Sequence, residues 1–469
     1  MSLIIPANTL ASGGYEVANS VRLNDGSSDY FNRSPSSATN QKTFTISMWV
    51  KRGELGSSNG LLLQGVNSGN NDFAIYFTSA DKLQTFSWSG GSKQFQVDTQ
   101  RVFRDVSAFY HILFVADTTQ GTDSNRIKIY INGVQETALE NVTYPSQNIN
   151  LEYNDTSALW VGRSYGGHYF DGYMAEVVSV DGTALTPTDF GEFDEDSGIW
   201  KPIDVSGLTF GTNGFYLDFE NSGALGADVS GNTNNFTVNN LTAIDQSTDT
   251  PTNNFATMNP LDNFYAASTF SEGNCKIITS SGNTSYNTAT VAVSSGKWYV
   301  EAKVIDNADS NYHHLGIAEV PTISTTDWLG KSAPHYGLTG YDGKIWRNNS
   351  GTAYGVSTTT NDIVGMYIDL DNNKLYFAKN GTLMNSGTGH SITAAASTAN
   401  GYYLIAYGDW ENLSTATWEV NFGNPTYTGT DQTDANGYGS FEYNPSSGTF
   451  DGASKDFLAI NTKNLAEYG

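Results

Sequence analysis

One run of acidic residues has a spacing that could support glycoside hydrolysis. Some glycanases place three acids on one face of a strand, in the order E-x-D-x-E, so that paired carboxylates flank the scissile bond. Glu192, Asp194 and Asp196 reproduce that alternation, but the last acid is Asp and not Glu. The charged residue Glu195 also stands where an apolar residue should face the core. We therefore interpret this segment as a solvated acidic loop and expect no catalytic residues and no enzymatic activity.

The histidines and the single cysteine do not form a metal or nucleophile pattern. The chain has six His and one Cys, and their spacing matches no zinc motif. His313 and His314 are neighbours on an expected strand, so their side chains should point to opposite faces of a sheet. Cys275 has no His close to it in the sequence, and we expect it to be a small buried residue.

Calcium is the one metal for which the expected loops carry suitable ligands. Ca²⁺ binds carboxylate and carbonyl oxygens, and Asp155, Asp171 and Asp181 are expected near loops. The run Asp-Leu-Asp-Asn-Asn (369–373) is similar to a calcium loop but lacks the Gly and the terminal Glu of an EF-hand, so we interpret it as a hairpin turn. The sequence therefore requires no cofactor, and Ca²⁺ at the three aspartates remains an alternative.

Aromatic residues in two expected loops have the chemistry of a sugar-binding site. Sugars stack on flat rings and exchange hydrogen bonds with flanking amides, carboxylates and backbone groups. One such loop lies in each half of the chain, and Trp residues elsewhere in the second half could join it. The candidate ligand-binding residues are Tyr165, His168, Tyr169, Trp328, Tyr341, Trp346, Arg347 and Trp410. In the alternative interpretation, Trp346 packs in a core and the loop tyrosines are ordinary surface residues.

The elements that position these residues are expected to be strands. Short apolar runs recur at intervals of roughly 8–12 residues between clusters of Gly, Asn, Asp and Ser, which is typical of sandwiches and barrels. The run Lys-Ile-Tyr-Ile ends in Asn132-Gly133, and Lys-Leu-Tyr-Phe-Ala-Lys ends in Asn380-Gly381. Each Asn-Gly pair predicts a tight hairpin, because a type I′ turn needs two positive φ angles. We therefore predict an all-β protein made of two antiparallel β-sandwiches.

Composition excludes several classes of function. The chain has 469 residues, enough for two or three domains, and 13% of them are aromatic.

Its net charge of −25 would repel phosphate backbones, so we expect no nucleic-acid partner. The first residues, MSLIIPANTLASGG, have neither a basic region nor a long apolar run, so we expect no signal peptide and no membrane insertion. A single cysteine favours assembly in a reducing cytosol.

The first half resembles concanavalin A-like, laminin-G-type sandwiches. Three motifs of that family occur in order: TFTISMWVK (43–51), IKIYINGV (127–134) and LWVGRSYGGHYFDGYMAEV (159–177). The run Thr-Pro-Thr-Asp-Phe (186–190) matches the short helix-like turn that closes the family's domain, with a capping Thr and Pro at the first helical position.

The second half resembles a SPRY-type sandwich, a relative of the lectin sandwich. The matching runs, in order, are GKWYVEAK (296–303), LGIA (315–318), GYDGKIW (340–346), DIVGMYIDLD (362–371) and WEVNFG (418–423). SPRY-type domains bind through loops at one end, which is the reason for grouping Trp328 and Trp410 with the loop at 341–347.

The whole chain is similar to structural proteins of marine bacteriophages. We expect an N-terminal arm (1–19), a concanavalin A-like sandwich (20–202), an ordered Asn/Thr/Gly-rich connecting segment (203–263), a SPRY-like sandwich (264–424) and a docked C-terminal tail (425–469).

This resemblance implies a virion protein, assembled in the host cytoplasm and exposed on the particle. The first hypothesis is a tail-fibre or receptor-binding protein, a homotrimer that contacts other virion proteins and binds host surface polysaccharide without cleaving it. The second is a capsid or tail decoration protein whose sandwiches mediate protein contacts. A polysaccharide depolymerase is the third.

Overall fold

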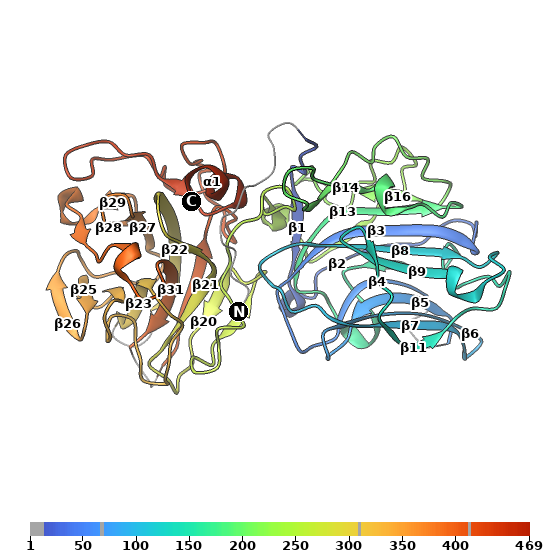
Figure 1. Ribbon diagram of the computed structural model, residues 1–469, viewed down its shortest axis with the longest axis horizontal. Coiled ribbons are helices and arrows are strands. Elements are labelled where there is room, and N and C mark those ends of the chain that lie inside the picture. The colour runs from blue at the N-terminus through green and yellow to red at the C-terminus, as the bar shows by residue number, and fades with distance from the viewer. Residues whose placement is uncertain (1–13, 66–69, 308–310, 411–413) are drawn as a thin grey trace. The chain divides into compact units, whose positions relative to one another are not determined.

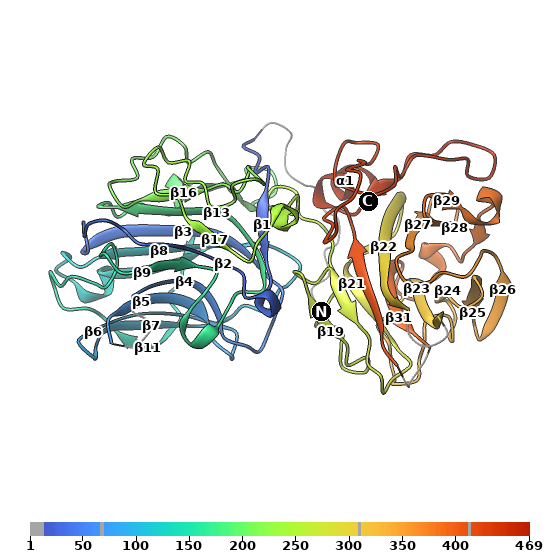
Figure 2. The same cartoon turned by 180° about the vertical axis from the view of Figure 1, so that it is seen from behind.

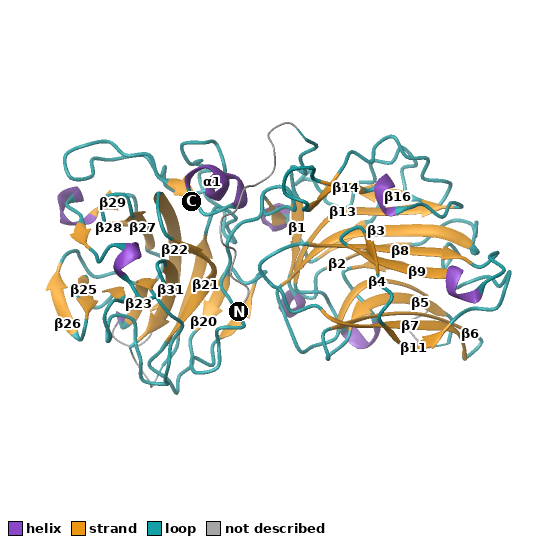
Figure 3. Ribbon diagram, in the orientation of Figure 1, coloured by secondary structure: helices purple, strands orange, loops and turns teal. Residues whose placement is uncertain are grey.

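The computed structural model describes residues 14–65, 70–307, 311–410 and 414–469. They divide into two compact units, which meet in sequence between Thr252 and Asn253 (Figure 1). The sheets of both units are antiparallel except where β33 pairs with β22, and the prediction of an all-β fold with two sandwiches is confirmed (Figure 3). In the described parts of the chain, no helix combines the length and the apolar character needed to cross a bilayer.

The first unit contains two large sheets that pack face to face. Within its described residues, the β3 sheet has the order β10-β9-β8-β3-β13-β1-β18, with β16 beside β13. Its strands are β1 (Ser20–Leu23), β3 (Thr43–Arg52), β8 (Tyr110–Asp117), β9 (Ile127–Ile131), β10 (Val134–Gln135), β13 (Gly172–Asp181), β16 (Phe215–Leu217) and β18 (Gln246–Ser247). The β5 sheet has the order β11-β7-β6-β5-β4-β12-β2-β17. Its strands are β2 (Tyr30–Arg33), β4 (Asn59–Gly65), β5 (Asp72–Phe77), β6 (Lys82–Ser89), β7 (Ser92–Val102), β11 (Leu139–Thr143), β12 (Leu159–Val161) and β17 (Thr237–Asn239).

The core of the first unit forms because the strands alternate. In β3, Phe44 and Ile46 face the β5 sheet, and the residues between them face the other way. The Phe73 ring of β5 meets the rings of Phe44 and Phe114 at 5.6 and 5.2 Å. Once the register is known, odd and even positions along each strand therefore show which side chains face the core and which face away from it.

The hairpin and cap predicted for this unit are present. β9 and β10 are joined by Asn132 and Gly133, whose φ angles are 49° and 78°, so the Asn-Gly hairpin is confirmed. Pro187–Asp189 form the 3-10 helix η4, and Thr186 and Asp189 make a reciprocal capping box. The predicted closing turn is therefore confirmed as well.

The connecting segment joins the sheets of the first unit. Residues 203–252 contribute three strands. In the β3 sheet, β16 pairs with β13 and β18 forms the edge beside β1. In the β5 sheet, β17 forms the edge beside β2. The unit boundary falls after Thr252, earlier in the chain than the expected end of the segment at 263. Residues 203–252 are thus part of the first sandwich, and residues 253–263 belong to the second unit.

The second unit is also a pair of sheets. Among its described residues, the β22 sheet has the order β19-β20-β32-β22-β27-β28-β29, with β30 beside β28 and β33 beside β22. Its strands are β19 (Thr269–Ser271), β20 (Lys276–Ile278), β22 (Lys297–Asn307), β27 (Ile363–Asp369), β28 (Lys374–Lys379), β29 (Thr382–Leu383), β30 (His390–Ser391), β32 (Ala416–Asn421) and β33 (Leu458–Ala459). The β31 sheet has the order β21-β31-β23-β24-β25-β26. Its strands are β21 (Tyr286–Val293), β23 (His313–Ala318), β24 (Tyr336–Thr339), β25 (Lys344–Arg347), β26 (Ser350–Ala353) and β31 (Tyr403–Asp409) (Figure 2).

The remaining elements are short. A two-stranded hairpin of the first unit pairs β14 (Gly191–Phe193) with β15 (Trp200–Pro202). The other helical elements are η1 (Asp25–Ser27), η2 (Asp123–Asn125), η3 (Tyr165–Gly167), η5 (Ala243–Asp245), η7 (Met384–Gly387), η8 (Ala395–Ser397) and α1 (Thr462–Tyr468).

The C-terminal tail is docked on the second sandwich around a buried carboxylate. Glu301 accepts hydrogen bonds from the hydroxyl of Tyr427 at 3.0 Å and from the backbone N–H of Glu442 at 2.6 Å. Burial raises the pKa of Glu301, and these donors from the tail oppose that rise. Phe441 and Phe457 pack on the outer face of the β22 sheet. The tail is thus ordered in the way the aromatic residues of its sequence indicated.

Candidate functional site

The acidic run of the first unit lies in β14 and in the turn that follows it. Asp194 accepts hydrogen bonds from the backbone N–H and the hydroxyl of Ser197, both at 2.9 Å. The Lys201 ammonium lies 3.2 Å from Asp194 and 3.3 Å from Glu192. The bonds from Ser197 and Lys201 hold the pKa of Asp194 at about 2, so this carboxylate stays ionised and stabilises the turn by accepting hydrogen bonds. Such a group has the wrong protonation state for a general acid.

The three candidate calcium ligands do not form one site. Asp171 precedes β13 and Asp181 ends it, so the two lie about 30 Å apart along an extended strand. Asp181 accepts from the backbone N–H of Asn213 at 3.0 Å, and Asp155 accepts from that of Ser157 at 2.7 Å. Across the described ranges, no group of three His, Cys, Asp or Glu side chains is arranged to hold a metal. Asp171 and Asp181 therefore cannot bind the same calcium ion, because the strand keeps them apart.

The predicted loop of the first unit connects β12 with β13. Tyr165 begins η3, and Gly166 and Gly167 adopt φ angles of 60° and 81°, which L side chains rarely adopt. His168 is exposed, and Tyr169 is half-buried. The loop thus presents His168 to solvent and directs Tyr169 toward neighbouring strands.

Tyr169 belongs to a group of rings around one guanidinium. The Arg163 guanidinium carbon lies 4.4 Å from the ring centroid of Trp160, 5.1 Å from that of Tyr30 and 5.3 Å from that of Tyr169. A cation over an aromatic face contributes about 0.5–1 kcal/mol at an exposed site. Arg163 therefore holds rings from three segments of the chain in place.

This group borders a larger aromatic surface on the outer face of the β5 sheet. In β5, alternation turns Ala74 and Tyr76 away from the core, and in β6 it does the same for Phe86 and Trp88. The surface, which we call the aromatic face, consists of Tyr30, Leu63, Ala74, Tyr76, Phe86, Trp88 and Trp160. Tyr76, Trp88 and Trp160 are half-buried, so each ring keeps one part open to solvent.

Amides and a carboxylate lie beside these rings. Asp98 of β7 accepts hydrogen bonds from the side-chain amides of Gln84 at 2.8 Å, Gln96 at 2.9 Å and Asn141 at 2.9 Å. The Tyr76 hydroxyl donates to Gln84, and burial together with the charge of Asp98 raises the pKa of Tyr76 to about 12. The phenol therefore remains a neutral hydrogen-bonding group across the physiological range.

Charged side chains border the same surface. The Lys93 ammonium lies 5.6 Å from the ring centroid of Trp88 and donates to Gln96 at 2.6 Å. Lys82 forms an ion pair with Glu140 at 2.8 Å. Open rings next to fixed amides, a carboxylate and ammonium groups can bind a polyhydroxylated ligand, because ring faces contact its C–H groups while the polar atoms bind its hydroxyls.

Sequence reasoning missed the aromatic face. Trp160 and Tyr30 lie far in the chain from the β5–β6 hairpin that carries the other rings, so only the register of the β5 sheet brings them together. A local signal did exist in β6, where Phe86 and Trp88 occupy the parity opposite to the core residue Leu83. Two large rings on the solvent parity of a strand indicate a second apolar surface.

In the second unit the structure brings the predicted tryptophans together. Trp328 stacks on Trp410 with centroids 4.8 Å apart, and Trp346 meets them edge-on at 5.4 and 5.3 Å. Tyr341, which is exposed, reaches this tryptophan cluster through Tyr312, whose ring lies 5.1 Å from that of Tyr341. Three of the four predicted aromatic residues therefore contact each other directly.

A buried histidine lies under the tryptophan cluster. His313 and His314 point to opposite faces of the β31 sheet as predicted, since His313 contacts Trp418 in the core and His314 contacts Trp328 on the outside. The His314 ring is fully buried, and neither of its nitrogens has a hydrogen-bond partner among the described residues. Burial lowers the pKa of His314 to about 3, so the imidazole is neutral.

Arg347 does not join the tryptophans. It follows Trp346 in β25, and alternation turns it to the opposite face, where it lies over the Tyr336 ring at 5.3 Å. Its guanidinium also donates to the hydroxyl of Thr393 at 3.1 Å. Grouping Arg347 with Trp346 as one binding surface was therefore wrong.

Comparison with known families identifies both sandwiches. Residues 25–189 match the concanavalin A-like lectin/glucanases superfamily, and residues 297–405 match the SPRY domain. The chain therefore contains a concanavalin A-like domain followed by a SPRY domain, as the motifs predicted. A comparison with curated proteins gives no match.

Solved structures with similarity to the chain include three of different kinds. The SPRY domain of human HERC1 shares 14% identity over 30% of this chain and 86% of its own, with a TM-score of 0.25. A putative carbohydrate binding protein from Bacteroides ovatus shares 18% identity over 48% of this chain and 59% of its own, with a TM-score of 0.31. A heptameric SAP-like pentraxin from Limulus polyphemus shares 12% identity over 34% of this chain and 72% of its own, with a TM-score of 0.26.

Proposed function

We propose that this protein is a non-enzymatic glycan-binding component of a tailed bacterial virus, exposed on the particle as a tail fibre or receptor-binding protein. The observation that carries the glycan-binding part is the aromatic face of the first unit. There, the half-buried rings of Tyr76, Trp88 and Trp160 lie beside the Asp98 amide network. The virion assignment rests on the resemblance of the whole sequence to bacteriophage structural proteins.

The chemistry of the aromatic face favours a chain of neutral sugars. Trp88 and Trp160 lie on different strands, so a ligand that contacts both must extend across the sheet. The hydrogen-bonding groups beside Trp88 are mainly amides, which come from β6, β7 and β11 and both accept from and donate to hydroxyls. A surface of this kind contacts a polysaccharide along its length and needs no deep pocket.

Weak individual contacts are sufficient if several copies act together. We expect a homotrimer that contacts other virion proteins, and linked copies convert later binding steps into intramolecular ones. The net charge of −25 keeps copies apart on a crowded particle and reduces binding to nucleic acid released by the host.

The glycan-binding proposal can be tested with the full chain on an array of bacterial surface polysaccharides. We expect binding to one structural class of polysaccharide, with no shortening of that polysaccharide in size-exclusion chromatography after prolonged incubation. Released oligosaccharides would instead identify a depolymerase. Absence of binding to every polysaccharide would contradict the proposal and favour a decoration protein.

The virion part needs a separate measurement. Immunogold labelling of intact particles with an antibody against this chain should mark the tail or fibre tips. Label spread evenly over the head would support decoration and contradict receptor binding. Particles without label would contradict the virion assignment itself.

A further inference from the structure

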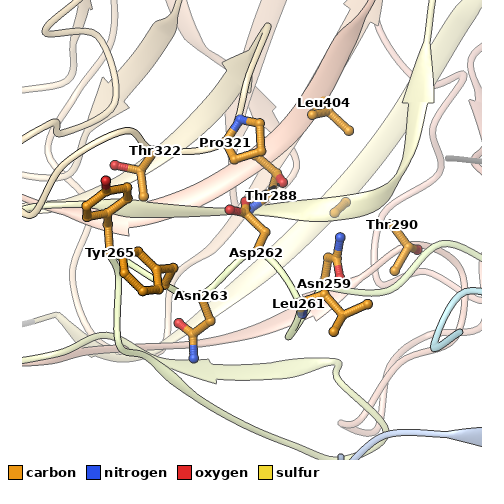
Figure 4. A pocket seen from close by; sticks show the side chains of 12 residues that line it. Asn259, Leu261, Asp262, Asn263, Tyr265, Thr288, Thr290, Pro321, Thr322 and Leu404 are labelled. Atoms are coloured by element: carbon orange, nitrogen blue, oxygen red, sulfur yellow. Dashed lines mark hydrogen bonds between the residues drawn. The ribbon is translucent and has the colours of Figure 1, made fainter. Parts of the chain in front are cut away.

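The second unit contains a pocket that is separate from the tryptophan cluster. It has a volume of about 310 Å³, at the lower end for small-ligand pockets of about 300–1,000 Å³. Its walls come from the loop 259–265, from β21 and β31, and from Pro321 and Thr322 after β23 (Figure 4). The loop and β21 lie outside residues 297–405, so the matched SPRY domain supplies only part of this pocket.

The loop is rigidly attached to β21, which makes the pocket a formed feature. Asn263 donates to the carbonyl of Ser268 at 2.7 Å and accepts from its backbone N–H at 2.8 Å. Asn287 of β21 donates to the carbonyl of Asp262 and to the side chain of Asn263. Asn283 donates to the carbonyl of Tyr265 at 2.9 Å. Together with the bond from the backbone N–H of Asn259 to the carbonyl of Thr288 at 2.9 Å, these bonds fix the loop at both its ends.

A single carboxyl group points into the pocket. Figure 4 shows Asp262 at its centre, with Tyr265 on one side and Asn259 on the other. The Oδ2 atom of Asp262 accepts the backbone N–H of Thr288 at 2.9 Å and also the Thr288 hydroxyl. No hydrogen bond or ion pair to Oδ1 is found within the described residues, and this oxygen is therefore available to a ligand.

The carboxyl group has no cation to compensate it. The described lining residues include neither Lys nor Arg, and Asp262 is their only acid. Burial raises the pKa of Asp262 to about 7, and the bonds from Thr288 oppose that rise. The titratable groups near it are the phenols of Tyr265 on its own loop and Tyr286 on β21. Burial, Asp327 and Asp262 raise the pKa of Tyr286, so this phenol remains neutral.

Exposed aromatic rings form the rim of the pocket. The Phe264 side chain is 88% exposed, and its ring meets that of Tyr265 edge-on at 4.8 Å. Phe264 is far more exposed than the other phenylalanines on the surface, which is a costly arrangement for so large an apolar group. A ligand that covers this ring would remove that cost, and a cationic one would gain from the ring face as well.

We propose that this pocket binds a sugar unit that carries a protonated amine. The ammonium pairs with the free oxygen of Asp262, the sugar ring lies against Tyr265 and Phe264, and the hydroxyls bind Asn259 and Thr322. The pocket admits one sugar unit, whereas the aromatic face of the first unit takes an extended chain. This binding is therefore independent of the proposed glycan contact and would survive its failure.

Calorimetric titration of the full chain with 6-amino-6-deoxyglucose tests this proposal, with glucose and the N-acetylated amino sugar as neutral probes. The alkylamine stays protonated between pH 6 and 8, so changes in this range report on the protein. At pH 8 we expect the amino sugar to bind at least about tenfold more tightly than either neutral probe, since hydrogen bonds to charged groups are the stronger ones. At pH 6 its affinity should fall about tenfold, because most Asp262 carboxyls are then protonated.

Variants locate the effect. Asp262→Asn keeps an oxygen to accept from Thr288, so the loop should fold, but it should abolish the preference for the amine and its pH dependence. Phe264→Ala should weaken binding of all three sugars severalfold. Asp306→Asn, which removes an exposed acid of the same unit, is the matched control and should change nothing. Equal affinity for charged and neutral probes, no binding of the amino sugar, or unchanged binding by Asp262→Asn would each overturn the proposal.

Discussion

The two units display their aromatic residues in opposite ways. On the aromatic face of the first unit, Trp88 and Trp160 lie on different strands with β5 and β4 between them, and amides lie beside Trp88. In the second unit, Trp328, Trp346 and Trp410 pack on one another with centroids about 5 Å apart. Ring faces that contact each other are no longer available to a ligand. A count of aromatic residues therefore does not identify a binding surface, whereas the open area beside each ring does.

This comparison assigns different tasks to the two groups. The tryptophan cluster covers a neutral His314 and acts mainly as a small core outside the β31 sheet, with Tyr341 as its exposed border. The aromatic face is the binding surface that we propose. The variants below would change stability in one unit and ligand binding in the other, and a reversal of that pattern would break the comparison.

The largest effect is expected from Trp328→Ala in the tryptophan cluster. Trp328 is 5% exposed, and replacing a buried Trp with Ala costs about 3–5 kcal/mol. Hydrogen exchange measured by mass spectrometry should show faster exchange in β23 and β31 and unchanged exchange in β5 and β6. A loss of polysaccharide binding without faster exchange would show that this cluster is the binding surface.

A smaller effect is expected from His314→Phe, and it depends on pH. Because burial lowers the pKa of His314 to about 3, the unfolded chain takes up a proton below pH 6.5 that the folded chain resists. The contribution of this histidine to the free energy of unfolding is therefore fully present above pH 6.5. It decreases as the pH falls, and the loss reaches about 2 kcal/mol at pH 5. In denaturant titrations, the free energy of unfolding should fall between pH 7.5 and pH 5 in both proteins, and the fall should be about 2 kcal/mol smaller for His314→Phe than for the wild type. Identical pH dependence in both proteins would show that the ring is accessible to solvent.

Arg163→Ala should weaken polysaccharide binding by the first unit without unfolding it. Its guanidinium contacts three rings, and losing about 1 kcal/mol of positioning corresponds to roughly a fivefold weaker affinity. Surface plasmon resonance on immobilised polysaccharide would measure the change. An unchanged affinity would show that the rings around Arg163 do not belong to the binding surface.

The smallest effect is expected from Arg347→Ala. This residue lies over Tyr336 on the face opposite to Trp346, so its removal should alter affinity by less than a factor of two, within about 0.5 kcal/mol. It also serves as the matched control for Arg163→Ala on the same sensor surface. A larger loss of affinity in Arg347→Ala would indicate that the second unit contacts the glycan.

The sequence allowed the architecture to be predicted because its signals were local. The Asn-Gly pairs at 132–133 and 380–381 each lie at a hairpin with two positive φ angles. The turn interpretation of 369–373 is also confirmed, since β27 ends at Asp369 and β28 begins at Lys374. Such features depend on a few neighbouring residues and their backbone preferences.

The binding surfaces depended on distant residues and were harder to predict. Trp160 and Trp88 are brought to one face by the order of strands in the β5 sheet, and Asp262 by the packing of a loop on β21. The grouping of Arg347 with Trp346 rests on their adjacency in sequence, and it fails because adjacent residues of a strand face opposite ways.

The central claim, that the aromatic face is the glycan contact, is tested most directly by the double variant Trp88→Ala/Trp160→Ala. Its affinity for the polysaccharide bound by the wild type would be measured beside that of Trp410→Ala, with hydrogen exchange to verify that both variants are folded. Two central aromatic contacts contribute about 2 kcal/mol or more together, so the account predicts at least about a thirtyfold loss for the double variant and little change for Trp410→Ala. Retained binding by the folded double variant, with binding lost in Trp410→Ala, would contradict it.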